Sequence, residues 1–101
     1  MHTIVHRIRL KPDASPEDFE RWVREVDYAT CPKLPGLVSF AVHRIPGGRE
    51  YFEVIAVDSP GAFEKDMTLP HFRALVERFE TMAEVVEETS GERVEPGYHR
   101  G

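Results

Sequence analysis

The segment Tyr51–Val57 constrains the fold more than any other part of the sequence. Aromatic and β-branched residues dominate it, and it contains neither Gly nor Pro, which predicts a β-strand. Both faces of its pleat are apolar except for Tyr51 and Glu53, which share one face because they lie two residues apart. A strand that is covered on both faces lies inside a sheet. A carboxylate in such a strand needs a partner or a function.

Patterns along the rest of the chain predict a small α+β domain. The predicted elements are a strand over 3–10, a helix from 16 to about 29, strands over 37–45 and 51–57 joined by the turn 46–48, a helix from about 58 that breaks at Pro70 and resumes at 71, and a short strand from 85 to about 91. Residues 92–101 are expected to form an irregular tail. This order is the ferredoxin-like βαββαβ arrangement, in which a four-stranded antiparallel sheet carries both helices on one face. Residues 1–101 therefore form a single domain.

The helix-free face of this sheet is also expected to be apolar. The pattern assigns to it Ile4, Ile8, Leu10, Leu37, Ala41, Ile55 and Val57. The opposite, helix-covered face would then pair Val38, Phe40 and Val42 with Phe52, Val54 and Ala56. A monomer would expose more apolar surface than the few hundred Å² that soluble proteins usually tolerate, so we expect a homodimer packed sheet against sheet.

Composition argues against several classes of function. The formal net charge of -5 disfavours a nucleic-acid partner. No apolar run approaches the roughly 20 residues that a membrane-spanning helix needs, and the N-terminus does not resemble a secretion signal. The single cysteine, Cys31, cannot form an intrachain disulfide, so a cytoplasmic location is expected.

Several segments resemble a known group of proteins. They are Tyr51–Ile55, Ala62–Met67, Met82–Glu88 and Glu95–Tyr98, together with Pro35-Gly36-Leu37 before the second strand. The chain is similar to the dimeric α+β barrel group of antibiotic-biosynthesis monooxygenases, muconolactone isomerases and haem-degrading enzymes. Within it, the second half resembles the RedY-like proteins of prodiginine and bisindole pigment clusters. That resemblance implies a cofactor-free tailoring enzyme of secondary metabolism that cyclises or condenses an indole- or pyrrole-derived intermediate by proton transfer.

The candidate catalytic residues follow from the strand order. Five polar side chains could line the helix-free face between the two sheets of a dimer: His6, Ser39, His43, Tyr51 and Glu53. In a ferredoxin-like sheet the first strand lies beside the third, so His6 can approach Glu53 across one strand spacing of about 4.8 Å. A carboxylate fixes the orientation of a His and raises its pKa, which suits a general acid or base. Tyr51 could donate a hydrogen bond to a developing oxyanion. The alternative is that His6 and Glu53 only satisfy each other's hydrogen bonds.

Two further histidines are candidates. His43 shares a face with Glu53 if the hairpin loop has an odd length, and otherwise lies at an exposed strand end. His71 follows Pro70 at a helix start, where the helix dipole would keep the imidazole neutral and Asp66 is near enough for contact; the alternative is a capping or surface role. The expected catalytic set is His6, Tyr51, Glu53 and His71. The expected substrate-binding set is Ser39, His43, Phe63, Asp66 and Met67.

Neither a metal nor a cofactor is expected. His2 and His6 share a face but lie about 13 Å apart along an extended strand, too far for one ion. Two alternatives to an acid–base enzyme remain open. One is a non-catalytic protein that binds and delivers an aromatic intermediate. The other is an oxygenase of the same group, either without a cofactor or with His71 as a haem ligand.

Overall fold

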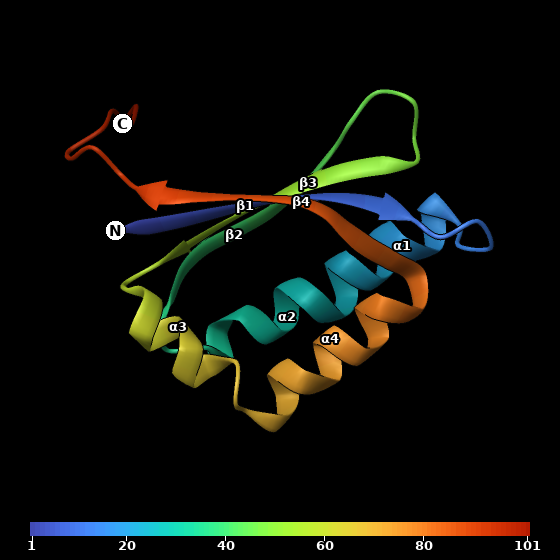
Figure 1. Cartoon of the computed structure of the whole chain (residues 1–101), viewed down its shortest axis with the longest axis horizontal. Coiled ribbons are helices and arrows are strands. Elements are labelled where there is room, and N and C mark those ends of the chain that lie inside the picture. The colour runs from blue at the N-terminus through green and yellow to red at the C-terminus, as the bar shows by residue number, and fades with distance from the viewer.

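A four-stranded antiparallel sheet forms one layer of the computed structural model, which describes residues 1–101, and the helices form a second layer on one face of it (Figure 1). The strand order is β2-β3-β1-β4, as expected for a ferredoxin-like fold. The strands are β1 (His2–Leu10), β2 (Leu37–Arg44), β3 (Glu50–Val57) and β4 (Ala83–Glu92). The helical segments are α1 (Pro16–Trp22), η1 (Val23–Asp27), α2 (Tyr28–Thr30), η2 (Cys31–Lys33), α3 (Pro60–Asp66) and α4 (Pro70–Met82).

Serine caps and prolines set where the helices begin. The Ser15 side chain accepts a hydrogen bond from the Asp18 N–H, and Pro16 occupies the first turn of α1. Ser59 caps α3 in the same way by accepting from the Ala62 N–H. Pro70 separates α3 from α4, so the predicted break is confirmed.

The helical layer contains one irregular turn. α1 runs into η1, a π-helical turn in which the Tyr28 N–H donates to the Val23 carbonyl, five residues back. The chain then continues through α2 and ends in the short 3₁₀-helix η2. Turns of this kind inside α-helices are often found at functional sites, because they change the direction in which side chains point.

The predicted strands are confirmed, with one change at the last. β1 is central, and its His6 lies directly opposite Glu53 of β3. β4 begins at Ala83, immediately after the last residue of α4, rather than near Val85. Ala83 lies opposite Leu10, and the ladder between β1 and β4 shifts register between Arg7 and Ile8.

The assignment of the two sheet faces was wrong for β1 and β3. His6 and Glu53, expected on the helix-free face, face the helices. On β2 the assignment was correct for Phe40 and Val42, which face the helices, and for Ala41, which faces away. Ile8, Leu10 and Tyr51 are buried beneath the helices, against Phe19 and Trp22. Ile55 and Val57 pack with Phe63 of α3 in a second buried cluster. Phe52, Val54 and Ala56 point instead to the uncovered face, together with Val5. Arg7 and Arg9 of β1 also lie there, where their guanidinium groups reach Glu50 and water.

The hairpin register also differs from expectation. The Ile45 N–H donates to the Glu50 carbonyl, and Arg44 lies opposite Tyr51. The loop over residues 46–49 therefore has an even length. A change of one residue in register reverses every side chain. Phe40 and Val42 consequently face the helices from β2, opposite Ile55 and Glu53.

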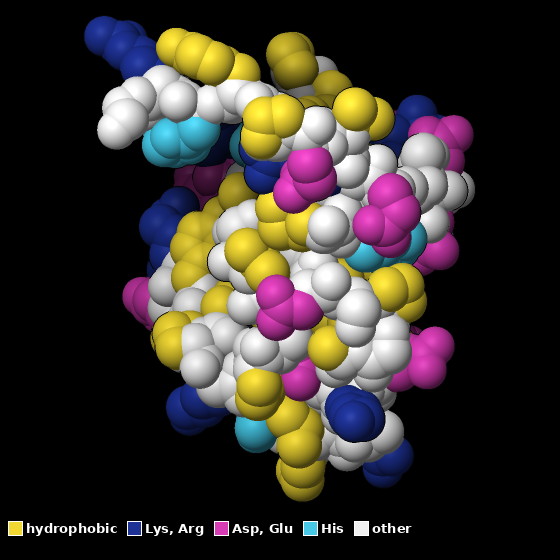
Figure 2. All heavy atoms as spheres, turned by 90° about the vertical axis from the view of Figure 1, so that its left-hand side faces the viewer, with side chains coloured by type: hydrophobic (Ala, Val, Ile, Leu, Met, Phe, Trp, Pro, Cys, Tyr) yellow, Lys and Arg dark blue, Asp and Glu magenta, His cyan; other side chains and the backbone are white.

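The two chain termini lie at the same end of the molecule as α3 (Figure 1). Residues 93–101 form no regular element, and they project from the sheet as an extended arm. Figure 2 shows this end with charged side chains of both signs scattered among apolar ones, so it carries no continuous surface of one charge. None of the helices has the length and hydropathy of a membrane span.

Candidate active site

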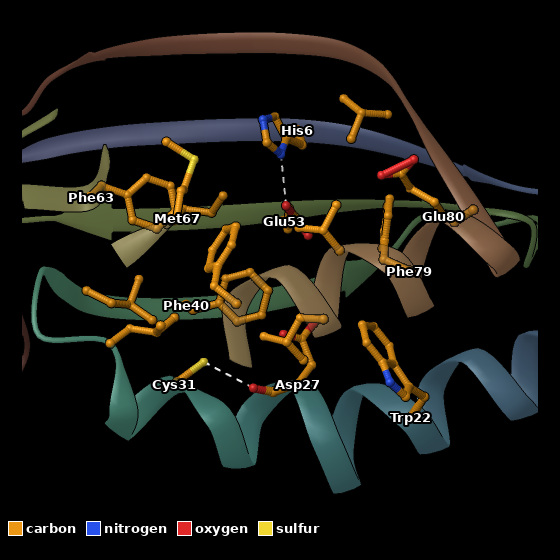
Figure 3. A pocket seen from close by; sticks show the side chains of 18 of the residues that line it. His6, Trp22, Asp27, Cys31, Phe40, Glu53, Phe63, Met67, Phe79 and Glu80 are labelled. Carbon is orange, nitrogen blue, oxygen red and sulfur yellow. Dashed lines mark hydrogen bonds and ion pairs between the residues drawn. The ribbon is translucent and has the colours of Figure 1, made fainter. Parts of the chain in front are cut away.

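A cavity of about 620 Å³ lies between the sheet and the helices (Figure 3). This volume is in the range that small-molecule sites occupy. Hydrophobic residues make up 14 of the 20 that line it, and five of these are aromatic residues from both layers: Trp22, Phe40, Phe63, Phe72 and Phe79. Their ring faces suit a flat aromatic ligand.

His6 and Glu53 meet at the sheet side of the cavity. The His6 Nδ1 lies 2.8 Å from the Glu53 carboxylate, and both side chains are largely buried, with 20% and 14% of their areas exposed. The other ring nitrogen, Nε2, lies 2.6 Å from Glu88 of β4, whose side chain is 63% exposed. His6 thus has a carboxylate at each nitrogen, one inside the cavity and one towards water.

This arrangement stabilises the charged imidazolium. The hydrogen bond to Glu53 is the main cause that raises the pKa of His6, burial opposes it, and Glu88 adds to the increase. In the charged ring both nitrogens donate. Since Nε2 faces Glu88 and water, the part of the pair that meets a ligand in the cavity is the Glu53 carboxyl group, which shares a proton with Nδ1.

Asp27 is a third acid of the cavity, and the sequence analysis did not select it. It ends the π-helical turn η1 and lines the cavity with His6 and Glu53. No pattern in the sequence distinguishes it from an ordinary helix-surface acid. Glu88 was also missed, because it is one of several acids in the last strand and no pattern distinguishes it from the others.

Comparison with known proteins identifies the family. The model of the family described as "REDY-like protein HapK" matches residues 2–94. The chain belongs to the REDY-like HapK family. HapK from Hahella chejuensis is 48% identical, with all of both chains covered and a TM-score of 0.94. The resemblance to RedY-like proteins is thereby confirmed.

More distant solved structures share the fold of this chain. SnoaB, a cofactor-independent oxygenase from Streptomyces nogalater, is 18% identical, with a TM-score of 0.78 and coverage of 95% of this chain and 97% of SnoaB. PA3566 from Pseudomonas aeruginosa is also 18% identical, with a TM-score of 0.73 and coverage of 92% and 93%. The predicted fold class is confirmed. A comparison with proteins of curated function found no match.

Tyr51 of this HapK-family chain does not reach the cavity. Its ring is 1% exposed in the core, and its hydroxyl donates to Glu20 of α1 at 2.7 Å. Burial, with the nearby Glu20 carboxylate, raises the pKa of Tyr51 to about 12. Arg44 also donates to Glu20 and is the main cause that lowers the Glu20 pKa to about 2. Tyr51 therefore belongs to a structural network, and its expected role as an oxyanion donor is wrong.

Ser39 and His43 lie on the uncovered face of the sheet. His43 is opposite Phe52 and stacks on it, with ring centroids 4.7 Å apart. Ser39 lies opposite Ala56, beyond the register shift that follows Leu37. Neither side chain lines the cavity, because the even-length hairpin loop turns both away from Glu53. Their placement with the candidate site was wrong.

The residues predicted around α3 divide into two groups. Phe63 and Met67 line the cavity, and their role in substrate binding stays a prediction. Asp66 is buried, and its carboxylate accepts the Gly36 N–H at 2.8 Å, so it braces the loop before β2. His71 lies outside the cavity wall, with its Nε2 3.3 Å from the Lys33 carbonyl. The expected contact between Asp66 and His71 is absent, and so is a haem-ligand position for His71.

The remaining polar groups do not form a metal centre. No three His, Cys, Asp or Glu side chains converge as a metal site would require. Cys31 lies in the cavity wall rather than in an isolated loop, and its Sγ contacts the Asp27 main-chain carbonyl at 3.4 Å. Burial raises the pKa of Cys31 to about 11, which keeps it a thiol at neutral pH and makes it a poor nucleophile.

Proposed function

We propose that this protein is a small tailoring enzyme of secondary metabolism that needs no cofactor. It binds a planar indole- or pyrrole-derived intermediate in the cavity and promotes its cyclisation or condensation by proton transfer. The observation that carries this proposal is the His6–Glu53 pair, 2.8 Å apart, facing an aromatic cavity of about 620 Å³. Membership of the REDY-like HapK family supports it.

The pair can move a proton in both directions. The proton shared by His6 Nδ1 and Glu53 passes from the Glu53 carboxyl group to a basic atom of the substrate, and the same carboxylate accepts a proton when the product forms. Glu88 holds Nε2, so the ring keeps one orientation. The aromatic side chains of the wall exclude water and keep the ring of the substrate in one orientation.

A homodimer is part of the proposal. The uncovered face carries apolar side chains from three strands, namely Val5, Ala41, Phe52, Val54 and Ala56. Packing this face against a second copy would remove it from water. One end of the uncovered face carries charged side chains that could form ion pairs at the edge of such an interface. They are Arg7, Arg9 and Glu50.

Substitution of the pair tests the function. Indole- and pyrrole-derived intermediates are incubated with the wild-type protein, His6→Asn and Glu53→Gln, and both binding and product formation are measured. General acid–base groups contribute about 10²- to 10⁴-fold to rate, so we expect turnover to fall by this order while binding is retained. His2→Asn is the matched control, because His2 lies on the same strand and contacts the exposed Glu92.

Other outcomes would decide against the proposal. Unchanged turnover in both variants would remove His6 and Glu53 from the chemistry. Binding without turnover by the wild-type protein would support a delivery protein instead. Consumption of O₂ with each turnover would favour the oxygenase alternative. SnoaB, which has the same fold, is a cofactor-independent oxygenase.

A further inference from the structure

Asp27 is the partly buried acid of the cavity wall whose carboxyl group has no partner in the protein. No donor reaches its carboxyl oxygens in a hydrogen bond or an ion pair, although the side chain lines the cavity (Figure 3). The other three acids of the wall differ from it: Glu53 contacts His6, whereas Glu80 and Glu84 are exposed to water. A partly buried carboxyl group without a partner is costly, so its persistence at a cavity wall points to a ligand.

The local backbone presents Asp27 to the cavity. It is the last residue of the π-helical turn η1, whose wider hydrogen bond changes the direction of the side chains that follow Val23. The Cys31 thiol uses the main-chain carbonyl of Asp27 and leaves the carboxyl group free. In Figure 3 Asp27 lies on the helix side of the cavity, across from Glu53 on the sheet side.

Charge around the cavity favours a positive ligand. The other titratable groups of the wall are His6, Lys11, Cys31, Glu53, Glu80 and Glu84. Carboxyl groups outnumber the two cationic side chains, and Lys11 already donates to the Glu80 main-chain carbonyl. Burial first, and then the charge of Glu53, raises the pKa of Asp27 to about 7. In the empty cavity Asp27 therefore holds a proton much of the time at neutral pH.

We infer that Asp27 recognises a planar nitrogen heterocycle that becomes positively charged in the cavity. A neutral basic ligand takes up one proton at its ring nitrogen, from the Asp27 carboxyl group where that group is protonated and from the solvent where it is ionised, and the resulting N–H⁺ donates to the carboxylate. No other bond changes. The aromatic faces of Trp22 and Phe40 then stabilise the cation. This inference rests on the proposed function and adds the charge state of its substrate class.

The test uses two probes with the same three-ring skeleton. Norharmane has a basic ring nitrogen and emits differently as a neutral base and as a cation, whereas carbazole lacks that nitrogen. Both are titrated into the wild-type protein, Asp27→Asn and Glu25→Gln at a pH where free norharmane is neutral. Glu25 is the control, because it is an exposed acid of the same turn.

We expect wild-type protein to bind norharmane with cation emission. Asp27→Asn should bind it about tenfold or more weakly, with neutral emission, since a hydrogen bond to a charged group is lost. The dissociation constants of carbazole for the wild-type protein and for Asp27→Asn should agree within about twofold. This agreement would also show that the cavity of the variant is intact. Glu25→Gln should match the wild-type protein with both probes.

Three results would overturn the inference. They are neutral emission from norharmane in the wild-type cavity, equal affinity and cation emission in Asp27→Asn, and an equal loss of carbazole binding in that variant. Binding of neither probe would overturn the proposed function as well. If norharmane depends on Asp27 while His6→Asn and Glu53→Gln keep full turnover, only the proposed catalytic role fails.

Discussion

His6 has a carboxylate at each ring nitrogen, and this makes its contribution to stability depend on pH. Because its pKa in the folded protein lies above the ordinary 6.5, the contribution is complete below pH 6.5 and is lost as pH rises through the folded value. The stability difference between the wild-type protein and His6→Asn, measured by urea unfolding, should therefore shrink as pH rises above 6.5. Glu53→Gln should weaken this dependence, as the hydrogen bond to Glu53 is its main cause. A difference that does not change with pH would contradict the assignment.

The contribution of Glu20 to stability should depend on pH in the opposite direction. The Arg44 hydrogen bond, with that of Tyr51, lowers its pKa from 4.5 to about 2, so the stability it contributes is present above pH 4.5 and is lost as pH falls towards 2. The advantage of the wild-type protein over Glu20→Gln should be larger near pH 5 than near pH 3. Thermal unfolding at both pH values measures it. The same difference at both would show that the contact between Glu20 and Arg44 contributes little, as exposed ion pairs often do.

At the residue scale, the sequence predicted the His6–Glu53 pair but not the third acid. Adjacent strands place His6 and Glu53 opposite each other whatever the details of the loops. Asp27 depends on a π-helical turn, which differs from an α-helix by one hydrogen bond and leaves no periodic signal. Ser39 and His43 were misplaced because one residue in the hairpin loop decides on which face they lie.

Among the elements, the junction of α3 with the loop before β2 depends on one buried carboxylate. Asp66 accepts the Gly36 N–H at 2.8 Å, and Gly36 is packed so closely that an added Cβ would lie 2.9 Å from the Ala62 main chain. Asp66→Ala should cost about 1–3 kcal/mol of unfolding free energy, because it leaves a buried N–H without an acceptor. Urea titration measures this cost.

The control for this substitution is Asp58→Ala, in the same region. Asp58 is exposed, and only its main-chain N–H contacts Gly36, so the change should stay within about 0.5 kcal/mol. Equal effects of the two substitutions would show that the Asp66 carboxylate does not brace the loop.

The elements themselves were predictable, whereas the faces of β1 and β3 were not assigned correctly. Serine caps, prolines and alternation located all four strands and the break at Pro70. β3 is apolar on both faces, so it carries no information about which face the helices cover. The residues that indicate the uncovered face are in β1. The charged side chains of Arg7 and Arg9 must point to the face that is open to water. Ala83 was assigned to a helix because no loop separates α4 from β4.

At the scale of the whole molecule, the uncovered sheet face should control assembly. Val54→Arg introduces a charge at the centre of the proposed dimer interface and should produce monomers in sedimentation velocity experiments, because a buried charge without a partner is costly. Val26→Arg is the control, since Val26 is an exposed residue of the helical layer. Identical sedimentation of both variants and the wild-type protein would argue against this face as the interface.

The position of Trp22 has a practical consequence. It is the only tryptophan of the chain, it is 9% exposed, and its ring forms part of the cavity wall. Its intrinsic emission therefore reports from one place alone, next to where a flat ligand would stack. Quenching of the Trp22 fluorescence, or energy transfer from Trp22 to a coloured compound, needs no added label. A library of pigments and their precursors can therefore be screened in solution by measuring the emission of this one residue.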